Sequence, residues 1–426
     1  MAEAVGVLED RDVAVAETRG LEALDVSEVE AAASGQPDWL REARLAAWET
    51  YLATPMPTTK QEEWRYTKVS QLGLDEVTFG AGDEGAAVRI GFEEEYAAKG
   101  VILTDLATAA REQPELVREY LGRAVSADAG KFQALNGALW GAGVFLYVPR
   151  GVRLEHPVRV RRSIERGGVA LLPRTLIVAE EGSQVAYVDE FASSDLDEPA
   201  LSIGAVEVFA KQAAQVQYVG LQRWGRGVRH LSQLRTIAER DANLDTLVVN
   251  LGASVARVDM AASLEGPGAR SDMLGLYFAH DDQHFDHNTR QDHVSDHATS
   301  DLLYKGALYD ATRSIFRGII KVFPGAQRTD AYQTNRNLLL SGKARADSLP
   351  NLEIEADDVR CSHGATVGQL DAEEMFYLRS RGLSKEEAER LVIFGFFGEV
   401  LERLPLPGVV EELREAISRK IGWHHG

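Results

Sequence analysis

Histidine and aspartate are concentrated in one stretch of the chain, residues 280–297. Five of the ten histidines lie there with five aspartates between them: His280, His284, His287, His293 and His297, with Asp281, Asp282, Asp286, Asp292 and Asp296. Imidazole and carboxylate groups are good ligands for zinc and iron. However, no two of these histidines have the two-residue spacing that aligns imidazoles on one strand face, and the metalloprotease pattern His-Glu-x-x-His is absent. A metal or active site here therefore competes with a plainer interpretation, in which the histidines are structural or surface residues.

A second group of reactive side chains surrounds the only cysteine, Cys361, in the run from Asp357 to Thr366. Cys361 and His363 are two residues apart, so on a strand their side chains would project from the same face. A thiolate beside an imidazole can act as a nucleophile or bind a metal as a pair. A buried structural cysteine next to a hydrogen-bonded histidine is the alternative.

Two motifs that carry common chemistries are absent. The phosphate-binding pattern G-x-x-x-x-G-K-[ST] does not occur, because Ser341-Gly342-Lys343-Ala344 lacks both the earlier glycine and the hydroxyl residue. The nucleophile pattern G-x-S-x-G is also missing. One thiol is too few to hold an iron–sulfur cluster unaided, since such clusters usually take about four thiolate ligands. Any cluster or ATP-driven step would therefore depend on a partner.

Bulk composition narrows the class of protein. At 426 residues, the chain should form two or three structural units. A net charge of −20 repels nucleic acid, and no apolar run approaches the roughly 18 to 20 residues of a membrane-spanning helix. The acidic segment Met1–Thr18 lacks the apolar core of a secretory signal, and a lone cysteine fits a reducing cytoplasm. We expect a cytoplasmic protein that binds neither nucleic acid nor membrane.

A recurring sequence pattern indicates which fold positions the histidines and the cysteine. The pattern Ala-x-x-Asp-x-Leu starts at Ala242, Ala269 and Ala298, at offsets of 27 and 29 residues, and again at Ala344. Farther upstream, Gln184–Val188 is echoed by Gln215–Val219 after 31 residues. Recurrence at such periods is typical of stacked repeats.

Short segments rich in Val, Leu, Ile and Tyr lie within and between these repeated patterns. Several of them alternate apolar with polar residues, as strands do. The segments are Thr175–Val178, Val185–Val188, Val206–Phe209, Val216–Leu221, Leu247–Leu251, Leu274–Phe278 and Ile315–Val322. Two strands and two turns per repeat make one flattened coil of a β-helix. The alternative is a β-sandwich or barrel with coincidental spacing. The charged segment Arg159–Arg166 is predicted to be a solvated excursion.

Helices are expected on both sides of this core. Capping residues and apolar periodicity predict helices at Leu24–Ser34, Trp39–Leu52, Asp105–Leu121, Phe132–Trp140, Ala372–Arg381, Ser384–Leu404 and Val409–Ile421, after a loosely ordered leader at Met1–Gly20. The predicted organisation is a helical region at 1–100, a β-helix at 101–360 with a helical lead-in at 105–140, and a helical domain at 361–426. The helix through Leu391–Leu404 has more apolar residues than one face needs. The additional residues either contact a partner protein or pack on the end of the β-helix.

The block Asn351–Gly382 resembles the SufB/SufD family of iron–sulfur cluster assembly proteins, and its SufD branch in particular. Cys361–Gly368 and Phe376–Gly382 match in register, and further matches are Glu63–Thr67, Tyr147–Gly151, Leu303–Gly306 and Gln333–Ser341. The SufB branch carries a functional cysteine where this chain has Ile354, and Glu-His-Glu-Ala where it has Cys361–Gly364.

This resemblance implies a right-handed parallel β-helix between helical N-terminal and C-terminal regions. It also implies a non-catalytic subunit that pairs with SufB through the β-helices and binds the ATPase SufC through the C-terminal helices. His363 matches the family residue at the SufB–SufD interface, where the cluster is built, and Cys361 is its adjacent thiol. We expect no metal site beyond His363 and no stably bound cofactor, the iron–sulfur cluster being held transiently in the complex. The surplus apolar residues predicted to meet SufC are Phe394, Phe396, Phe397 and Leu401.

Three alternatives stay open on the sequence alone. The first is a β-helix enzyme or metal-binding protein that uses the cluster from His280 to His297. The second is a purely structural scaffold for SufB and SufC. In isolation, a homodimer is the alternative to a monomer.

Overall fold

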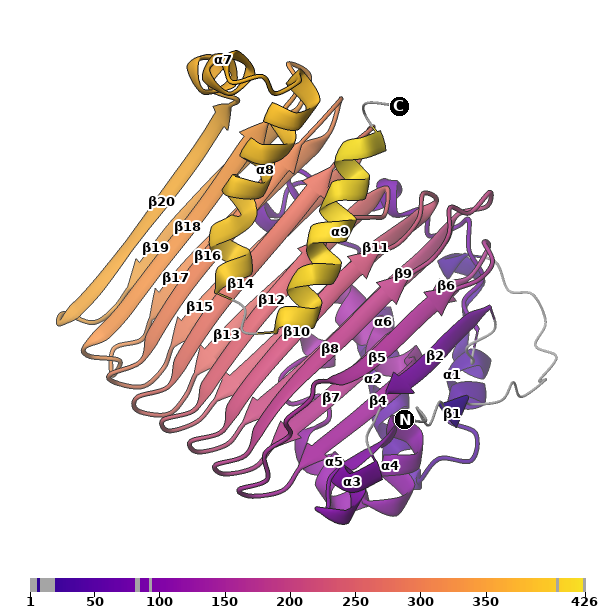
Figure 1. Ribbon diagram of the computed structural model, residues 1–426. Coiled ribbons are helices and arrows are strands. Elements are labelled where there is room, and N and C mark those ends of the chain that lie inside the picture. The colour runs from indigo at the N-terminus through magenta and orange to yellow at the C-terminus, as the bar shows by residue number, and fades with distance from the viewer. Residues whose placement is uncertain (1–5, 8–19, 81–84, 92–93, 404–405, 424–426) are drawn as a thin grey trace.

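The computed structural model describes residues 6–7, 20–80, 85–91, 94–403 and 406–423. Within these residues the chain forms a long flattened solenoid of two stacked sheets, with helices on the outer face of each sheet (Figure 1). The leader predicted at Met1–Gly20 lies outside the described residues except for Gly6, Val7 and Gly20. Leu404, the predicted end of one helix, also lies outside them.

Successive coils of the solenoid contribute one strand to each sheet. The first sheet runs in the order β1 (Gly6–Val7), β2 (Ala86–Gly91), β5 (Val158–Ile164), β8 (Gln184–Ala192), β10 (Gln215–Arg223), β12 (Asn243–Asn250), β14 (Arg270–Ala279), β16 (Thr299–Leu308), β18 (Thr329–Leu339) and β20 (Val359–Gln369). The second runs in the order β3 (Ile102–Asp105), β4 (Gly141–Val148), β7 (Pro173–Ala179), β9 (Ala200–Ala210), β11 (Val228–Ala238), β13 (Val255–Leu264), β15 (His284–His293), β17 (Arg313–Val322) and β19 (Arg345–Ile354), with β6 (Ala170–Leu171) beside β9.

Strand pairing within the solenoid is parallel, and from β7 onward each strand pairs with the strand two positions along the chain. A sandwich built from hairpins would instead pair consecutive strands in antiparallel fashion. The β-helix prediction is therefore confirmed, and the sandwich alternative is excluded. Antiparallel pairs occur only at the start of the described solenoid, where β1 meets β2, β2 meets β5, and β3 meets β4.

The repeated pattern Ala-x-x-Asp-x-Leu marks equivalent positions in successive coils. Arg270, which follows Ala269, pairs with Asn243 on one side and with Thr299 on the other. The alanines that open the first three copies are fully buried at the turns. The fourth copy differs, because Ala344 precedes β19 in the second sheet rather than the next strand of the first. Its offset from the third copy therefore spans one and a half coils.

The charged segment Arg159–Arg166 is not the solvated excursion that was predicted. Most of it forms β5, and the Arg162 side chain is fully buried inside the solenoid. Arg162 forms an ion pair with Asp189 and donates a hydrogen bond to Thr175 Oγ1 at 3.0 Å. Charge count alone missed this strand because its central arginine meets a buried carboxylate rather than water.

Helices cover the second sheet and the start of the solenoid. They are α1 (Val26–Ala32), α2 (Asp38–Ala53), α3 (Glu94–Ala98), α4 (Leu106–Glu112), α5 (Pro114–Tyr120) and α6 (Lys131–Leu139), with 3-10 turns η1 (Leu21–Ala23), η2 (Glu62–Trp64), η3 (Val69–Leu72) and η4 (Ala127–Ala129). Asp25 and Asp105 are the N-terminal capping residues of α1 and α4. The single helix predicted up to Leu121 is divided in two, because Pro114 begins a new helix.

Three helices close the chain: α7 (Ala372–Ser380), α8 (Lys385–Glu402) and α9 (Pro407–Trp423). The last two lie across the outer face of the first sheet (Figure 1) and bury Phe397 and Ile417 in an apolar cluster with strand residues such as Leu276. The boundary of this region was predicted at residue 361. In the structure, strand β20 continues to Gln369 and the first helix begins at Ala372.

Aromatic rings fill the solenoid interior in a reciprocal pattern. Tyr304 pairs across the ladder with Gly275, and Tyr277 pairs with Gly306. A Cβ atom on Gly306 would approach the Tyr277 ring to 1.9 Å, and one on Gly275 would approach the Tyr304 ring to 2.4 Å. Each ring thus occupies the space that a side chain on the opposite strand would need.

We predict that Gly306→Ala lowers the free energy of unfolding by about 1–3 kcal/mol, because overpacking a filled core displaces rings from their rotamers. Gly204→Ala is the matched control: this glycine is also buried in a strand, but an added Cβ would lie 3.5 Å from its nearest neighbour, Pro173 Cγ. Chemical denaturation of both variants measures the difference. Equal losses would contradict the assignment of the Tyr277 ring to this space.

Candidate functional site

Cys361 and His363 lie on β20, the last strand of the first sheet (Figure 1). Cys361 pairs with Ala331 and His363 pairs with Gln333, both on β18. Ala331 and Gln333 are buried inside the solenoid, and Cys361 packs beside the same apolar cluster as Ala331. The cysteine and the histidine therefore share the inward side of β20, as their two-residue spacing predicts.

This site is at an open end of the solenoid. Among the described residues, no further strand pairs with the outer edges of β19 and β20. His363 is exposed, Cys361 is half-buried, and three apolar side chains nearby are 36–43% exposed: Leu352, Ile354 and Val367. Two unpaired strand edges with exposed apolar residues form a surface suited to strand-by-strand pairing.

The environment of Cys361 favours the neutral thiol. Burial raises the pKa of this thiol, and the nearby carboxylate of Asp330 raises it further, while a hydrogen bond with the backbone of Ala331 opposes both effects. A thiolate is the nucleophilic and metal-binding form of cysteine. In this chain alone, Cys361 is therefore not an activated nucleophile.

A buried amide lies on the strand next to His363, and sequence reasoning did not single it out. Gln333 is fully buried, and neither its Oε1 nor its Nε2 has a hydrogen-bond partner in the described part of the chain. The hydroxyl groups of Ser314 and Ser348, on the opposite sheet, are also buried without partners there. The available signal was the position of Gln333 at the start of the motif Gln333–Ser341. Buried groups without partners cost free energy, so this layer is poised to accept further hydrogen bonds.

The cluster from His280 to His297 does not converge on one site. Alternation along β15 places His284 on the outer face of the second sheet, where its Nε2 lies 2.9 Å from Thr67 Oγ1. His287 and His293 point into the solenoid, while His297 lies at an exposed turn with a φ of 57°. Among the described residues, no group of three or more His, Cys, Asp or Glu side chains is arranged to hold a metal. The hypothesis of an active site in this cluster thus loses its geometric basis.

Two of these histidines are buried neutral groups. His287 stacks on Tyr277, with ring centroids 4.5 Å apart, and its Nε2 lies 2.7 Å from Asn250 Nδ2. The Nε2 of His293 lies 2.8 Å from Ser300 Oγ. Burial lowers the pKa of each imidazole to about 4. Both histidines are therefore part of the packed interior.

The residues predicted to bind SufC differ in accessibility. Phe397 and Leu401 are buried between α8 and the first sheet, and Phe394 and Phe396 are half-buried. The exposed apolar side chains of this region are instead Phe376, Tyr377 and Leu391, which are 75%, 57% and 54% exposed.

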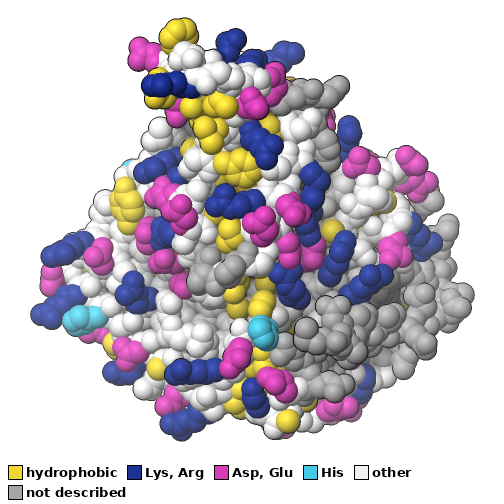
Figure 2. Space-filling view, viewed as in Figure 1, with side chains coloured by type: hydrophobic (Ala, Val, Ile, Leu, Met, Phe, Trp, Pro, Cys, Tyr) yellow, Lys and Arg dark blue, Asp and Glu magenta, His cyan; other side chains and the backbone are white. Residues whose placement is uncertain are grey.

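Phe376 and Tyr377 lie on α7, which projects beyond the sheets and carries hydrophobic side chains among charged ones (Figure 2). The motif Phe376–Gly382 was the signal that could have singled them out. The surplus of apolar residues along α8 could not identify them, because Phe376 and Tyr377 lie on α7.

Comparison with known proteins identifies related chains. The family model described as "SUF system FeS cluster assembly, SufBD core domain" matches residues 162–396, and the one described as "SufBD protein N-terminal region" matches residues 89–160. The chain is 34% identical to the iron–sulfur cluster assembly protein SufD of Bacillus subtilis, over 91% of this chain and 95% of that protein. It is 28% identical to a SufBD family protein of Staphylococcus epidermidis and 26% identical to B. subtilis SufB, over 94% of both chains in each case. No helix in the described residues is long and apolar enough to cross a membrane.

The buried imidazoles predict a specific pH dependence of stability. The folded-state pKa of His287, about 4, lies below its ordinary value of 6.5, so the unfolded chain binds more protons between these pH values. Stability contributed by the neutral imidazole is therefore present above pH 6.5 and is lost as the pH falls toward 4. The slope reaches about 1.4 kcal/mol per pH unit for one histidine.

Between pH 6.5 and 4, we expect His287→Gln to reduce the slope of unfolding free energy against pH. The reduction corresponds to the uptake of up to one proton fewer on unfolding. Denaturant titrations across this range measure the slope. Leu52→Ala, which removes an exposed apolar side chain on α2 and no titratable group, should leave the wild-type slope unchanged. An unaltered slope in His287→Gln would mean that His287 is protonated in the folded state.

Proposed function

The chain belongs to the SufBD family of iron–sulfur cluster assembly proteins, and on this basis we propose that it is a non-catalytic, SufD-type subunit of the cytoplasmic SUF machinery. In this role it pairs with SufB and binds the ATPase SufC, and an iron–sulfur cluster is built where the two solenoids meet. The observation that carries the proposal is the position of His363, exposed on an unpaired edge strand and directed toward the solenoid interior.

Pairing with SufB uses the open end of the solenoid. The edges of β19 and β20 offer unpaired backbone groups, and Leu352, Ile354 and Val367 offer apolar area. A partner from the same family has a solenoid of similar cross-section, so its terminal strands can extend both sheets at once. Joining the two ends buries the exposed apolar side chains and encloses the space around His363.

The chemistry of the enclosed site requires both chains. Iron–sulfur clusters usually take about four protein ligands, and this chain contributes one imidazole and one thiol. His363 is exposed and can reach iron through a neutral imidazole nitrogen. The thiol of Cys361 has a raised pKa and is half-buried, so its contribution depends on a partner or metal that favours the thiolate. The remaining ligands belong to SufB.

SufC docks on the C-terminal helices, with α7 at the centre of the contact. Phe376 and Tyr377 expose two aromatic rings on one short helix, and Leu391 adds apolar area at α8. Exposed aromatic residues of this kind commonly dominate the binding energy of an interface. The chain has no phosphate-binding loop motif, so ATP is hydrolysed by SufC alone.

We predict that His363→Ala leaves the complex with SufB and SufC intact but lowers its iron and acid-labile sulfide together, by about fivefold or more, because an exposed imidazole ligand is lost. The complex is co-expressed and purified without oxygen before both elements are measured. His156→Ala, at an exposed histidine between β4 and β5, is the matched control and should retain both. If His363→Ala keeps wild-type iron and sulfide, this chain is only a geometric scaffold.

A second prediction concerns SufC. Phe376→Ala should weaken SufC binding at least tenfold, since truncating a central interface aromatic typically costs about 2 kcal/mol. Affinity is measured by titrating SufC into the purified chain. Leu52→Ala removes an apolar side chain that is 62% exposed on α2 and should have no effect. Unchanged affinity in Phe376→Ala would place the docking surface elsewhere.

A further inference from the structure

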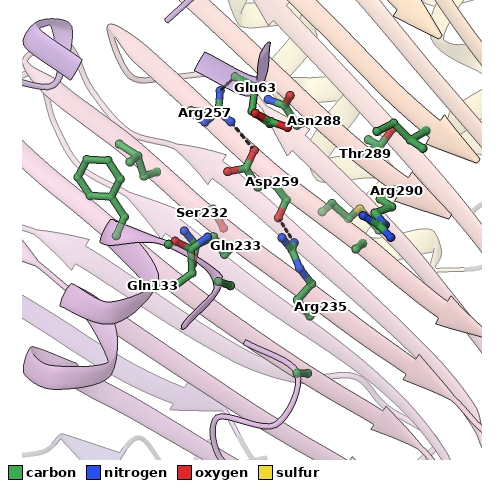
Figure 3. A pocket seen from close by; sticks show the side chains of 18 of the residues that line it. Glu63, Gln133, Ser232, Gln233, Arg235, Arg257, Asp259, Asn288, Thr289 and Arg290 are labelled. Atoms are coloured by element: carbon green, nitrogen blue, oxygen red, sulfur yellow. Dashed lines mark hydrogen bonds and ion pairs between the residues drawn. The ribbon is translucent and has the colours of Figure 1, made fainter. Parts of the chain in front are cut away.

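A deep groove lies on the outer face of the second sheet, far along the chain from His363. Its floor is formed by β11, β13, β15 and β17, and its roof by residues 54–64 together with residues 123–133 (Figure 3). The cavity volume is about 710 Å³. This lies within the range of pockets that hold small organic molecules.

The floor is hollow at its centre because a small residue lies between two large ones. Strand register aligns Arg235 on β11, Ala261 on β13 and Arg290 on β15 in one row. The two arginines are two strand spacings apart, roughly 10 Å. Ala261 leaves the space between them open, so two positive groups flank a central depression.

The groove is rich in positive charge although the chain as a whole is acidic. Six cationic and four carboxylate side chains line it: Arg123, Lys131, Arg235, Arg257, Arg290 and Arg317, with Glu63, Asp259, Glu265 and Asp292. Asp259 lies 2.9 Å from Arg257, Asp292 is 2.6 Å from Arg290, and Glu63 is 3.5 Å from Arg317. Most of the negative charge is thereby neutralised within the groove.

Three of the cations have no such partner. Within the described residues, no carboxylate lies within ion-pair distance of Arg123, Lys131 or Arg235. Arg235 donates only to backbone carbonyls, those of Leu234 at 3.0 Å and Asp259 at 2.7 Å. Arg123 lines the groove from the roof and Arg235 from the floor, whereas the Lys131 ammonium at the start of α6 donates to Tyr51 O and lies 3.7 Å from the centroid of the Tyr51 ring. The uncompensated charge favours an anion there.

The start of helix α6 adds backbone donors to the same space. Gly130, its N-terminal capping residue, has no side chain to cap the helix, and the first helical hydrogen bond runs from Ala134 N to Gly130 O. In the described chain, the N–H groups of Lys131, Phe132 and Gln133 therefore have no acceptor, and all three residues line the groove. Free N–H groups and the helix dipole at an N-terminus bind anions.

An independent sign of a ligand comes from Gln233 on the floor. Its side chain is only 4% exposed, it lines the groove, and its Oε1 has no hydrogen-bond partner in the described residues. A buried amide oxygen without a partner calls for a donor. The ligand that satisfies it must therefore carry an O–H or N–H group as well as negative charge.

We propose that this groove binds a small organic or inorganic anion, with phosphate or carboxylate oxygens held by Arg123, Arg235 and the α6 N-terminus, and a hydroxyl group donated to Gln233. This site is separate from the cluster-building end of the solenoid and does not depend on the proposed function. Occupancy ties the roof segments to the sheet, because the anion contacts both. Binding consequently stabilises the folded chain by mass action.

The test uses the full-length chain with two probes, inorganic phosphate and citrate, each of which carries anionic oxygens and a hydroxyl group. The melting temperature is followed at constant ionic strength, with sodium chloride as the reference salt. We expect a saturable rise with phosphate, with citrate or with both, and the probe that produces it identifies the chemical class. The absence of a saturable rise above chloride with both probes would overturn the proposal.

Variants distinguish the groove from general screening of charge. Arg235→Gln and Gln233→Met should each weaken the apparent affinity at least tenfold, and the second does so without changing net charge. Arg118→Gln removes an exposed arginine on α5 outside the groove and should bind like wild type. If Gln233→Met fails to fold, the half-buried Arg235 decides the question. Wild-type affinity in Arg235→Gln would overturn the proposal.

Discussion

In-register stacking of parallel coils is the constraint on which the rest of this structure depends. Each strand of the solenoid satisfies its backbone groups only through the strands of the preceding and following coils. A stack of this kind is stable in its middle and unsatisfied at its ends. At the start, antiparallel strands and helices cover the edge. At the other end, within the described residues, β19 and β20 remain unpaired, and the residues that resemble a cluster-building motif lie there.

The polar interior changes character along the same axis. Near the start, Arg162 is neutralised by Asp189, which also accepts hydrogen bonds from Thr175 and Tyr218. Farther along, His287 is enclosed by aromatic rings and held by Asn250. In the last coils, the Gln333 amide is buried without a partner. At the open end, joining a second solenoid can supply new donors and acceptors to this amide.

Sequence patterns predicted the elements whose burial is purely apolar. Segments such as Val216–Leu221 alternate or cluster aliphatic residues, and all seven of the segments predicted as strands overlap strands of the solenoid. The strands that pattern missed, β11, β13 and β15 among them, carry polar residues such as His230 and Gln291 at fully buried positions. No single-residue scale assigns these to an interior, because their burial depends on specific hydrogen-bond partners, Trp224 for His230 and Ser300 for Gln291. The same limit applied to the docking residues, since α8 has more apolar residues than one face needs and only packing shows that Phe397 is covered while Leu391 is not.

The distribution of helices determines where function can reside. α8 and α9 occupy the outer face of the first sheet, tied down by apolar packing and by ion pairs of Lys305 with Glu399 and of Arg403 with Asp272. The N-terminal helices cover much of the second sheet but leave its centre hollow above Ala261. In the described part of the chain, the open end with His363, the projecting helix α7 and the positively charged groove are among the regions that stay accessible. Each presents different side chains, namely an exposed imidazole beside unpaired strand edges, exposed aromatic rings, and arginines without carboxylate partners, so the occupants proposed for them would not compete for the same residues.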